Sequence, residues 1–229
     1  MLPSLQTPEF TTTVPSSGKE VKFRPFLVKE EKILYFALES GETGDIVSAI
    51  QKIFTNCILS DFEVDDMAYF DFEYLFLMLR AKSVGESIEL KLRHDVEDCG
   101  QVNDISINIE DIKVVTDPNH TDKIMLNDDI GVKMKYPTIE NLSLVQQDQN
   151  TFDIIRDSIE YVYDQETVYD DFTKDDADNF LESLSKSQFE LISEFFATMP
   201  KLRHEVKYKC KKCKKTETVL LEGLQSFFT

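Results

Sequence analysis

Hydrophobic positions follow a helical period in the first third of the chain. Apolar residues recur every three or four positions, which predicts helices over 30–40, from Thr43 to Cys57, and over 71–79. The third segment, FDFEYLFLML, is apolar on nearly every side, so we expect either a central core helix or a helix completed by another chain. Asp71 is placed to cap it.

The middle of the chain changes to a period of two. Ile, Leu and polar residues alternate over 88–93 and 105–110, which predicts two half-buried strands joined by a polar loop at 94–103. A second hairpin is expected from 124–126 to 132–136. The centre of the chain is therefore predicted to be antiparallel.

Helical spacing returns after a glutamine-rich stretch, 146–150, the best internal boundary in the sequence. Apolar residues over 152–162 predict one helix, and Thr173 is placed to cap a second. Ser187 and Glu190 stand at capping-box spacing before a third. The second half should thus be helical.

These segments predict an α+β protein with helical N-terminal and C-terminal parts around a central antiparallel β section, and with a C-terminal zinc-ribbon-like hairpin. The expected divisions are an extended, proline-punctuated arm, an N-terminal α+β part with central hairpins, a helical part, and a basic CxxC hairpin that packs back on the central strands. They cover residues 1–20, 21–145, 146–200 and 201–229.

Composition narrows the function classes. With 43 acidic against 25 basic residues the net charge is -18, which disfavours general coating of nucleic acid or of an anionic membrane. We expect no signal peptide and no membrane span, because no apolar run approaches ~20 residues. The seven glycines form no phosphate-binding loop, and GxSxG and HExxH are absent. We therefore expect no enzyme.

Acidic residues offer a competing hypothesis, a magnesium-dependent enzyme. Such runs are more often solvated loops or helix starts, and no partner base accompanies them. The candidate carboxylates are Asp61, Asp65, Asp66, Asp170, Asp171, Asp175 and Asp176. His120, in the segment DPNH, is predicted to be a turn residue.

Cysteines give the most specific chemical signal. Cys210 and Cys213 form a CxxC between two alternating strands, and this spacing lets two thiolates face one tetrahedral zinc ion. Four ligands need a second pair, and the only other candidate tip holds His94 and Cys99. A structural zinc ion is therefore a candidate cofactor. Two free thiols on a tight turn are the alternative, and a redox pair is disfavoured because no helix follows.

Basic residues are concentrated around this CxxC. Residues 201–215 carry a local charge of +7, so the remainder of the chain carries -25. A zinc-ribbon nucleic-acid binder that uses this segment is the alternative function, although only Tyr208 is available for stacking. Docking on an acidic protein surface is favoured. Another copy of this chain is one candidate partner, which would make the protein an oligomer.

Six segments resemble one known family, the baseplate hub assembly proteins of T-even-type contractile-tailed bacteriophages, including cyanophage relatives. The resemblance runs over nearly the whole chain. The segments are FRPFLVKEEKILYFALES (23–40), NCIL (56–59), FDFEYLFLMLRAKSVGE (70–86), KYP (135–137), FFATMPKL (195–202) and LEGLQSFF (221–228).

The resemblance implies a phage tail baseplate hub assembly protein, either a chaperone that leaves or a hub subunit that stays. It implies contacts with other hub or tape-measure proteins, no catalytic residues, and a place in the host cytoplasm during virion assembly or in the tail baseplate. Relatives often carry cysteine pairs at hairpin tips. Cys210 and Cys213 fit this pattern, whereas His94 and Cys99 are an incomplete counterpart.

Overall fold

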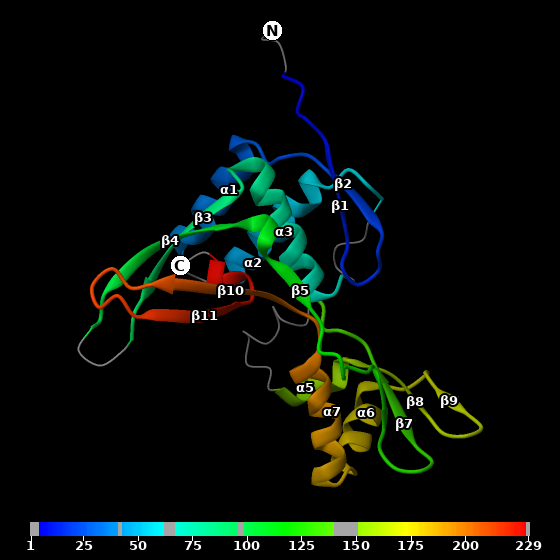
Figure 1. Ribbon diagram of the computed structural model, residues 1–229. Coiled ribbons are helices and arrows are strands. Elements are labelled where there is room, and N and C mark those ends of the chain that lie inside the picture. Colours follow the sequence, from blue (N-terminus) through cyan, green and yellow to red (C-terminus); the bar gives the residue numbers. More distant parts are fainter. Residues whose placement is uncertain (1–4, 41–42, 62–66, 96–98, 140–150, 228–229) are drawn as a thin grey trace. The chain divides into compact units, whose positions relative to one another are not determined.

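The computed structural model describes residues 5–40, 43–61, 67–95, 99–139 and 151–227 (Figure 1). It has helices and several small antiparallel sheets, which confirms the α+β class. The chain forms two compact units. Unit 1 comprises Met1–Val64, Phe70–Val115 and Lys201–Thr229, and unit 2 comprises Asp65–Tyr69 and Thr116–Pro200.

The described part of unit 1 combines three α-helices with three small sheets. Hairpins β1–β2 and β3–β4 are two-stranded, and the third sheet has the antiparallel order β11-β10-β5. Its elements are β1 Phe10–Thr13, β2 Glu20–Phe23, α1 Val28–Ser40, α2 Thr43–Cys57, α3 Tyr69–Ser83, β3 Ser87–Arg93, β4 Val102–Asn108, η1 Ile109–Asp111, β5 Lys113–Val115, β10 Lys201–Lys209, β11 Thr216–Glu222 and η2 Leu224–Phe227.

Helix α3 forms the core of unit 1. Most of its side chains are buried within the chain itself, as the core-helix expectation has it, and Phe72 packs on Phe54 of α2 with ring centroids 5.0 Å apart. Burial of each such side chain contributes about 1.5–3 kcal/mol to the free energy of folding. The apolar character of α3 is thus explained by intramolecular packing.

Two buried carboxylates of α3 fix distant parts of unit 1. The predicted cap Asp71 is wrong, because the helix begins two residues earlier; its carboxylate instead accepts a hydrogen bond of 2.9 Å from Ser16 N. Glu73 Oε1 accepts one of 2.6 Å from Leu224 N, at the start of η2. Leu224 and Phe227, near the C-terminus, are both buried.

The predicted arm at 1–20 is corrected over its second half. Strands β1 and β2 pair from Phe10↔Phe23 to Thr13↔Glu20, so this segment is a hairpin and not an arm. Gly18 has φ +67° in the connecting turn, a backbone angle that glycine adopts without strain. Val14 and Val21 are buried, which explains why the segment folds back.

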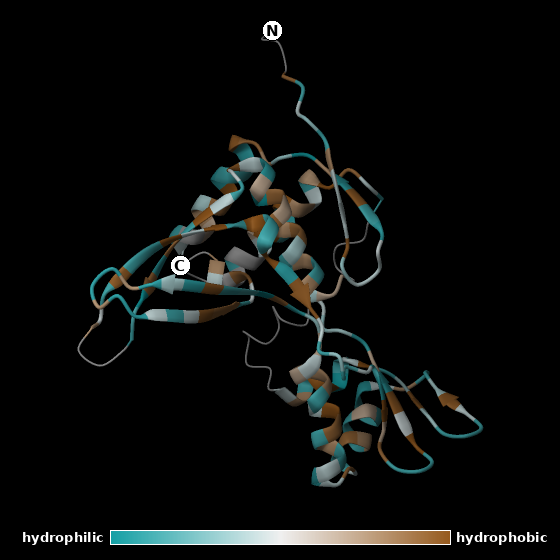
Figure 2. Ribbon diagram, in the orientation of Figure 1, coloured by the Kyte–Doolittle hydropathy of each residue, from teal (hydrophilic) through white to brown (hydrophobic). Residues whose placement is uncertain are grey.

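Within its described residues, unit 2 packs two helices and one short helix on a four-stranded antiparallel sheet with the order β6-β7-β8-β9. Figure 2 shows hydrophobic and hydrophilic residues sharing each of its helices, as expected where one face meets a core. Its elements are β6 Lys123–Met125, β7 Gly131–Met134, α5 Thr151–Asp157, β8 Ile159–Tyr163, β9 Val168–Tyr169, α6 Lys174–Glu182 and α7 Lys186–Thr198.

Two predictions for the second half need correction. The helix expected over 152–162 ends at Asp157, and Ile159–Tyr163 is strand β8, because these β-branched and aromatic residues pair with β7. The capping box before α7 uses Ser185 and Gln188, two residues before the expected pair. The predicted cap at Thr173 is confirmed, and the structure shows that Asp176 completes a capping box with it.

The boundary expected at 146–150 lies outside the described residues. Apart from the corrected arm over 1–20, the division into segments 21–145, 146–200 and 201–229 stays a prediction. The C-terminal strands do pair with the central part of the chain, since Leu202 of β10 lies opposite Val114 of β5.

Candidate metal centre

Two hairpin ends of unit 1 bring the predicted ligands together. His94 follows β3, where its N–H donates to Gln101 O at 2.9 Å and closes the loop before β4. The turn after β10 is closed in the same way, since Cys210 N donates to Lys215 O at 2.9 Å and Lys214 N donates to Cys210 O at 3.0 Å. His94 and Cys210 therefore sit on hydrogen-bonded backbone.

The four side chains form one cluster. One ligand atom from each of His94, Cys99, Cys210 and Cys213 lies within 4.8 Å of the others. Cys99 Sγ is 3.6 Å from Cys210 Sγ, and Cys213 Sγ is 3.6 Å from His94 Nδ1. A tetrahedral zinc ion needs S···S of about 3.8 Å and S···N of about 3.5 Å, from Zn–S ≈ 2.3 Å and Zn–N ≈ 2.0 Å. The donor set can thus hold a metal ion.

The electrostatics favour a thiolate at the centre of this cluster. Burial opposes ionisation of Cys210, but hydrogen bonds from the backbone N–H groups of Cys213 and Lys212, together with the neighbouring thiols, lower the pKa of the Cys210 thiol to about 6. A thiolate is the form that binds metal. Cys210 and His94 are buried while Cys213 is exposed, so an ion could enter from the side of Cys213.

The acidic alternative finds no comparable cluster. Asp65 and Asp66 lie outside the described residues. Asp176 is occupied as the partner of Thr173 in the capping box. Across the described ranges, no other His, Cys, Asp or Glu side chains gather closely enough to hold an ion. His120 does lie in a turn, where its N–H donates to Asp117 O at 3.0 Å, and this prediction is confirmed.

Three residues around the cluster were not identified from the sequence: Asn103, Tyr208 and Glu217. Asn103 is fully buried and bonds the CxxC loop. Tyr208 OH donates to Glu217 Oε2 at 2.7 Å, and the same carboxylate oxygen is 3.4 Å from His94 Nε2. The pairing of Tyr208 with Glu217 could have been predicted from the sequence. In a hairpin that turns at the CxxC, counting outward along both strands places these two residues opposite each other.

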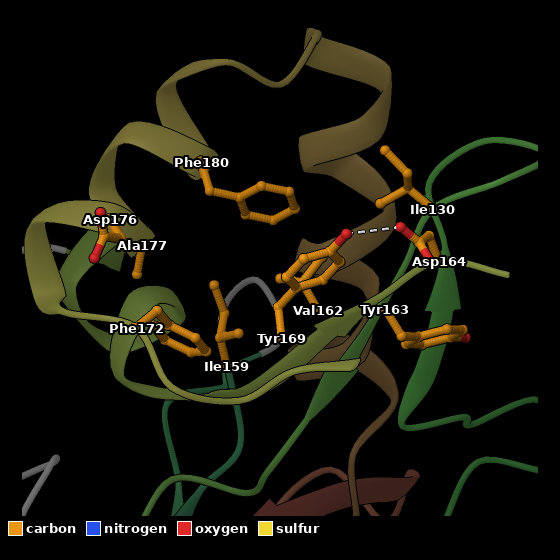
Figure 3. A pocket seen from close by; sticks show the side chains of 10 residues that line it. All are labelled: Ile130, Ile159, Val162, Tyr163, Asp164, Tyr169, Phe172, Asp176, Ala177 and Phe180. Carbon is orange, nitrogen blue, oxygen red and sulfur yellow. Dashed lines mark hydrogen bonds between the residues drawn. The ribbon is translucent and has the colours of Figure 1, made fainter. Parts of the chain in front are cut away.

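Unit 2 has its own apolar pocket of about 340 Å³. Figure 3 shows the rings of Tyr169, Phe172 and Phe180 around it, with the Tyr169 hydroxyl bonded to Asp164. Asp164 also accepts from the backbone N–H groups of Glu166 and Thr167. The lining carries no histidine, cysteine or basic side chain, so its chemistry suits an apolar group.

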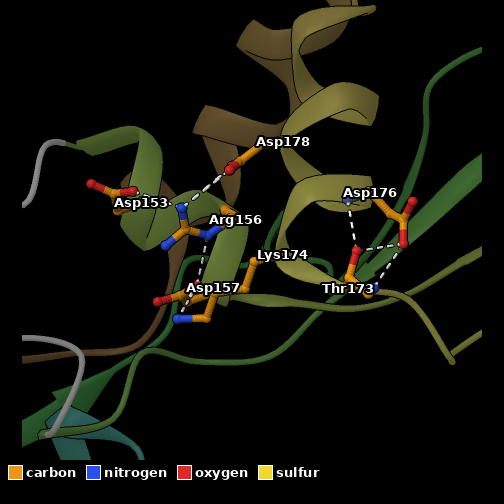
Figure 4. A network of polar contacts seen from close by, with 7 residues as sticks. All are labelled: Asp153, Arg156, Asp157, Thr173, Lys174, Asp176 and Asp178. Carbon is orange, nitrogen blue, oxygen red and sulfur yellow. Dashed lines mark hydrogen bonds and ion pairs between the residues drawn. The ribbon is translucent and has the colours of Figure 1, made fainter.

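Beside this pocket, Arg156 ties α5 to α6. Its guanidinium contacts Asp153 at 2.8 Å, Asp157 at 2.9 Å and Asp178 of α6 at 3.4 Å (Figure 4). The hydrogen bond to Asp157 raises the pKa of Arg156 above its ordinary value, so the guanidinium stays charged. The carboxylates of this network are therefore used in packing two helices and not in holding a cation.

Comparison with known proteins gives one result. The model of the family described as T4 bacteriophage base plate protein matches residues 7–229. No match was found among curated proteins or among solved structures. None of the described helices is both long enough and apolar enough to cross a bilayer.

Proposed function

Because the chain belongs to the family of T4 bacteriophage base plate proteins, we propose that it serves in assembly of the tail baseplate hub, as a hub subunit or as an assembly chaperone. The family match over residues 7–229 is the observation that carries this proposal. Family membership implies contacts with other phage structural proteins. The proposed direct partners are hub or tape-measure proteins, reached in the host cytoplasm during assembly, and the proposed role is binding without catalysis.

Exposed apolar side chains on α1 support a role in protein contacts. Val28, Tyr35 and Phe36 are 66%, 58% and 64% exposed, an unusual state for large apolar residues on one helix. We name these three residues the α1 surface. The α1 surface is therefore a better candidate for contact with a partner than α3, whose apolar residues are buried by its own chain. The basic segment 201–215 and the acidic remainder of the chain add charged surfaces that can orient a partner.

Co-purification tests this function. The full chain, tagged and expressed with hub and tape-measure proteins of the same phage, should retain at least one of them. The double variant Tyr35→Ser with Phe36→Ser should lose it, whereas Leu191→Ser, a similarly exposed residue of unit 2, should not. Retention of no tail component by the wild-type protein would contradict the proposed function.

We also propose that His94, Cys99, Cys210 and Cys213 hold one structural zinc ion. A four-ligand site with three sulfurs leaves no open position, which is typical of structural zinc. The ion would join the β3–β4 and β10–β11 hairpins. Elemental analysis of protein purified without chelator should give one zinc per chain, and Cys213→Ser should reduce this while Cys57→Ser, in α2, should not.

A nucleic-acid binder is the second candidate. The lysines of the CxxC turn are exposed at the hairpin tip, and this arrangement is what favours it. Binding to double-stranded DNA should then weaken steeply between 50 mM and 200 mM salt. Absence of a shift at the lower salt concentration removes this candidate and leaves baseplate assembly unaffected.

A further inference from the structure

We infer that Glu217 and Tyr208 are positioning residues for the metal centre: they fix the His94 imidazole so that Nδ1 faces the ion. The inference rests on the proposed zinc site. It specifies which nitrogen of His94 binds the ion, which residues determine this choice, and how much they contribute to the zinc affinity.

The two ring nitrogens of His94 face different partners. Nδ1 lies 3.6 Å from Cys213 Sγ, on the side of the cysteine cluster. Nε2 lies 3.4 Å from Glu217 Oε2, on the opposite side. A neutral imidazole carries one proton, and a carboxylate can only accept. The proton is therefore held on Nε2, which leaves the Nδ1 lone pair directed at the cluster.

Tyr208 holds the carboxylate in turn. Its hydroxyl donates to Glu217 Oε2 at 2.7 Å across the β10–β11 hairpin, where the two residues are direct partners. Its ring meets the His94 ring edge-on with centroids 6.5 Å apart. Both rings are buried, so the imidazole has little freedom to turn over. One tyrosine thus restrains both members of the contact.

Within the described residues, Glu217 Oε2 is the acceptor beside His94 Nε2. Glu217→Gln replaces this carboxylate by a neutral amide, which accepts a proton more weakly and can turn its NH₂ group toward Nε2 instead. The tautomer with the proton on Nδ1 would then compete, and this tautomer cannot bind the ion through Nδ1. Acceptors that orient a metal-bound histidine in this way typically contribute 10–100-fold to metal affinity. This is the size of effect expected here.

The test uses the full chain and measures zinc affinity by competition with a chromophoric chelator. Glu217→Gln should weaken zinc binding about 10–100-fold while one zinc per chain is still bound at saturation. Tyr208→Phe should act in the same direction. The double variant should be no weaker than Glu217→Gln alone, because both act through one imidazole. Glu205→Gln is the matched control. Glu205 is an exposed residue of β10, so its substitution should leave the zinc affinity unchanged.

A second measurement reports the tautomer directly. In zinc-loaded wild-type protein, long-range ¹H–¹⁵N spectra should show the His94 proton on Nε2, and cobalt-loaded Glu217→Gln should keep its thiolate-to-metal absorption. Zinc affinity of Glu217→Gln within twofold of wild type, or a proton on Nδ1, overturns this inference alone. Failure of the wild-type chain to bind zinc would instead overturn the proposed zinc site.

Discussion

Asn103 Oδ1 accepts a hydrogen bond of 2.9 Å from the backbone N–H of Lys211, 108 residues later in the chain. The Asn103 amide nitrogen donates to Gln101 O at 3.0 Å and lies 3.9 Å from Cys210 Sγ. One fully buried side chain therefore joins the β3–β4 loop to the CxxC turn. It aligns the two halves of the candidate metal centre independently of any ion.

We predict that Asn103→Ala lowers the free energy of unfolding by about 1–3 kcal/mol, because it removes a fully buried side chain together with the acceptor of the partly buried Lys211 N–H. Urea denaturation of zinc-loaded protein measures this. The control is Asp104→Asn, which removes an exposed contact of 3.2 Å to Lys211 Nζ and should cost less than about 1 kcal/mol. Equal effects of the two variants would contradict the role of Asn103.

The cysteines should react with a thiol reagent in two groups. Cys99, Cys210 and Cys213 should be protected by zinc and react once a chelator removes it. Cys57 should react only on unfolding, because it is buried and burial raises the pKa of its thiol to about 11. Titration with a chromogenic disulfide at neutral pH counts both groups. Reaction of three thiols before chelation would show that no ion protects them.

Removal of the buried ion pair at the start of α1 should destabilise unit 1. Arg24 Nη2 lies 2.9 Å from Glu30 Oε1, and the Glu30 side chain is fully buried. Glu30→Gln leaves the arginine uncompensated, so the free energy of unfolding should fall by about 3 kcal/mol. Glu31→Gln, an exposed neighbour in the same turn, is the control.

The effect of Glu30→Gln should depend on pH in a defined direction. Burial opposes ionisation of Glu30, yet hydrogen bonds from Arg24 and from Leu27 N hold its pKa below the ordinary value. Its contribution is therefore fully present above the pKa of the unfolded chain, about 4.3, and is lost as pH falls through the folded pKa. The difference between wild type and variant should shrink below pH 4. A constant difference would contradict this account.

Protonation of His120 should make unit 2 less stable in mild acid. Its Nδ1 bonds Thr198 Oγ1 at 3.0 Å and its Nε2 bonds Tyr136 OH at 3.0 Å. Thr198 Oγ1 donates to Glu194 O at 2.7 Å, so it accepts from Nδ1–H, and Nε2 accepts from Tyr136. The neutral ring therefore fits both partners.

Burial lowers the pKa of His120, although the charges of Asp122 and Asp117 oppose this. A lowered folded pKa means that stability is present above the unfolded pKa of about 6.5 and is lost as pH falls below it. Denaturation midpoints of unit 2 should decrease from pH 7.5 to pH 5.5. His120→Gln should flatten this decrease and His204→Gln, in unit 1, should not. An unchanged slope in His120→Gln would contradict the assignment.

Local patterns in the sequence were enough to predict the helices α1 to α3, the hairpins β3–β4 and β6–β7, and the Thr173 cap. Each depends on neighbours within a few residues, where period and capping chemistry act directly. The four candidate ligands were also identified, because a CxxC between alternating strands restricts the remaining choices to His94 and Cys99.

Tertiary structure decided what local patterns leave open. Ile159 and Val162 fit a helix and a strand equally well, and pairing with β7 selects the strand. The apolar surface of α3 could have met another protein, but folding buries it within unit 1. Convergence of His94 and Cys210 depends on contacts between residues more than a hundred positions apart. Such contacts form only when the whole core packs, so no local period encodes them.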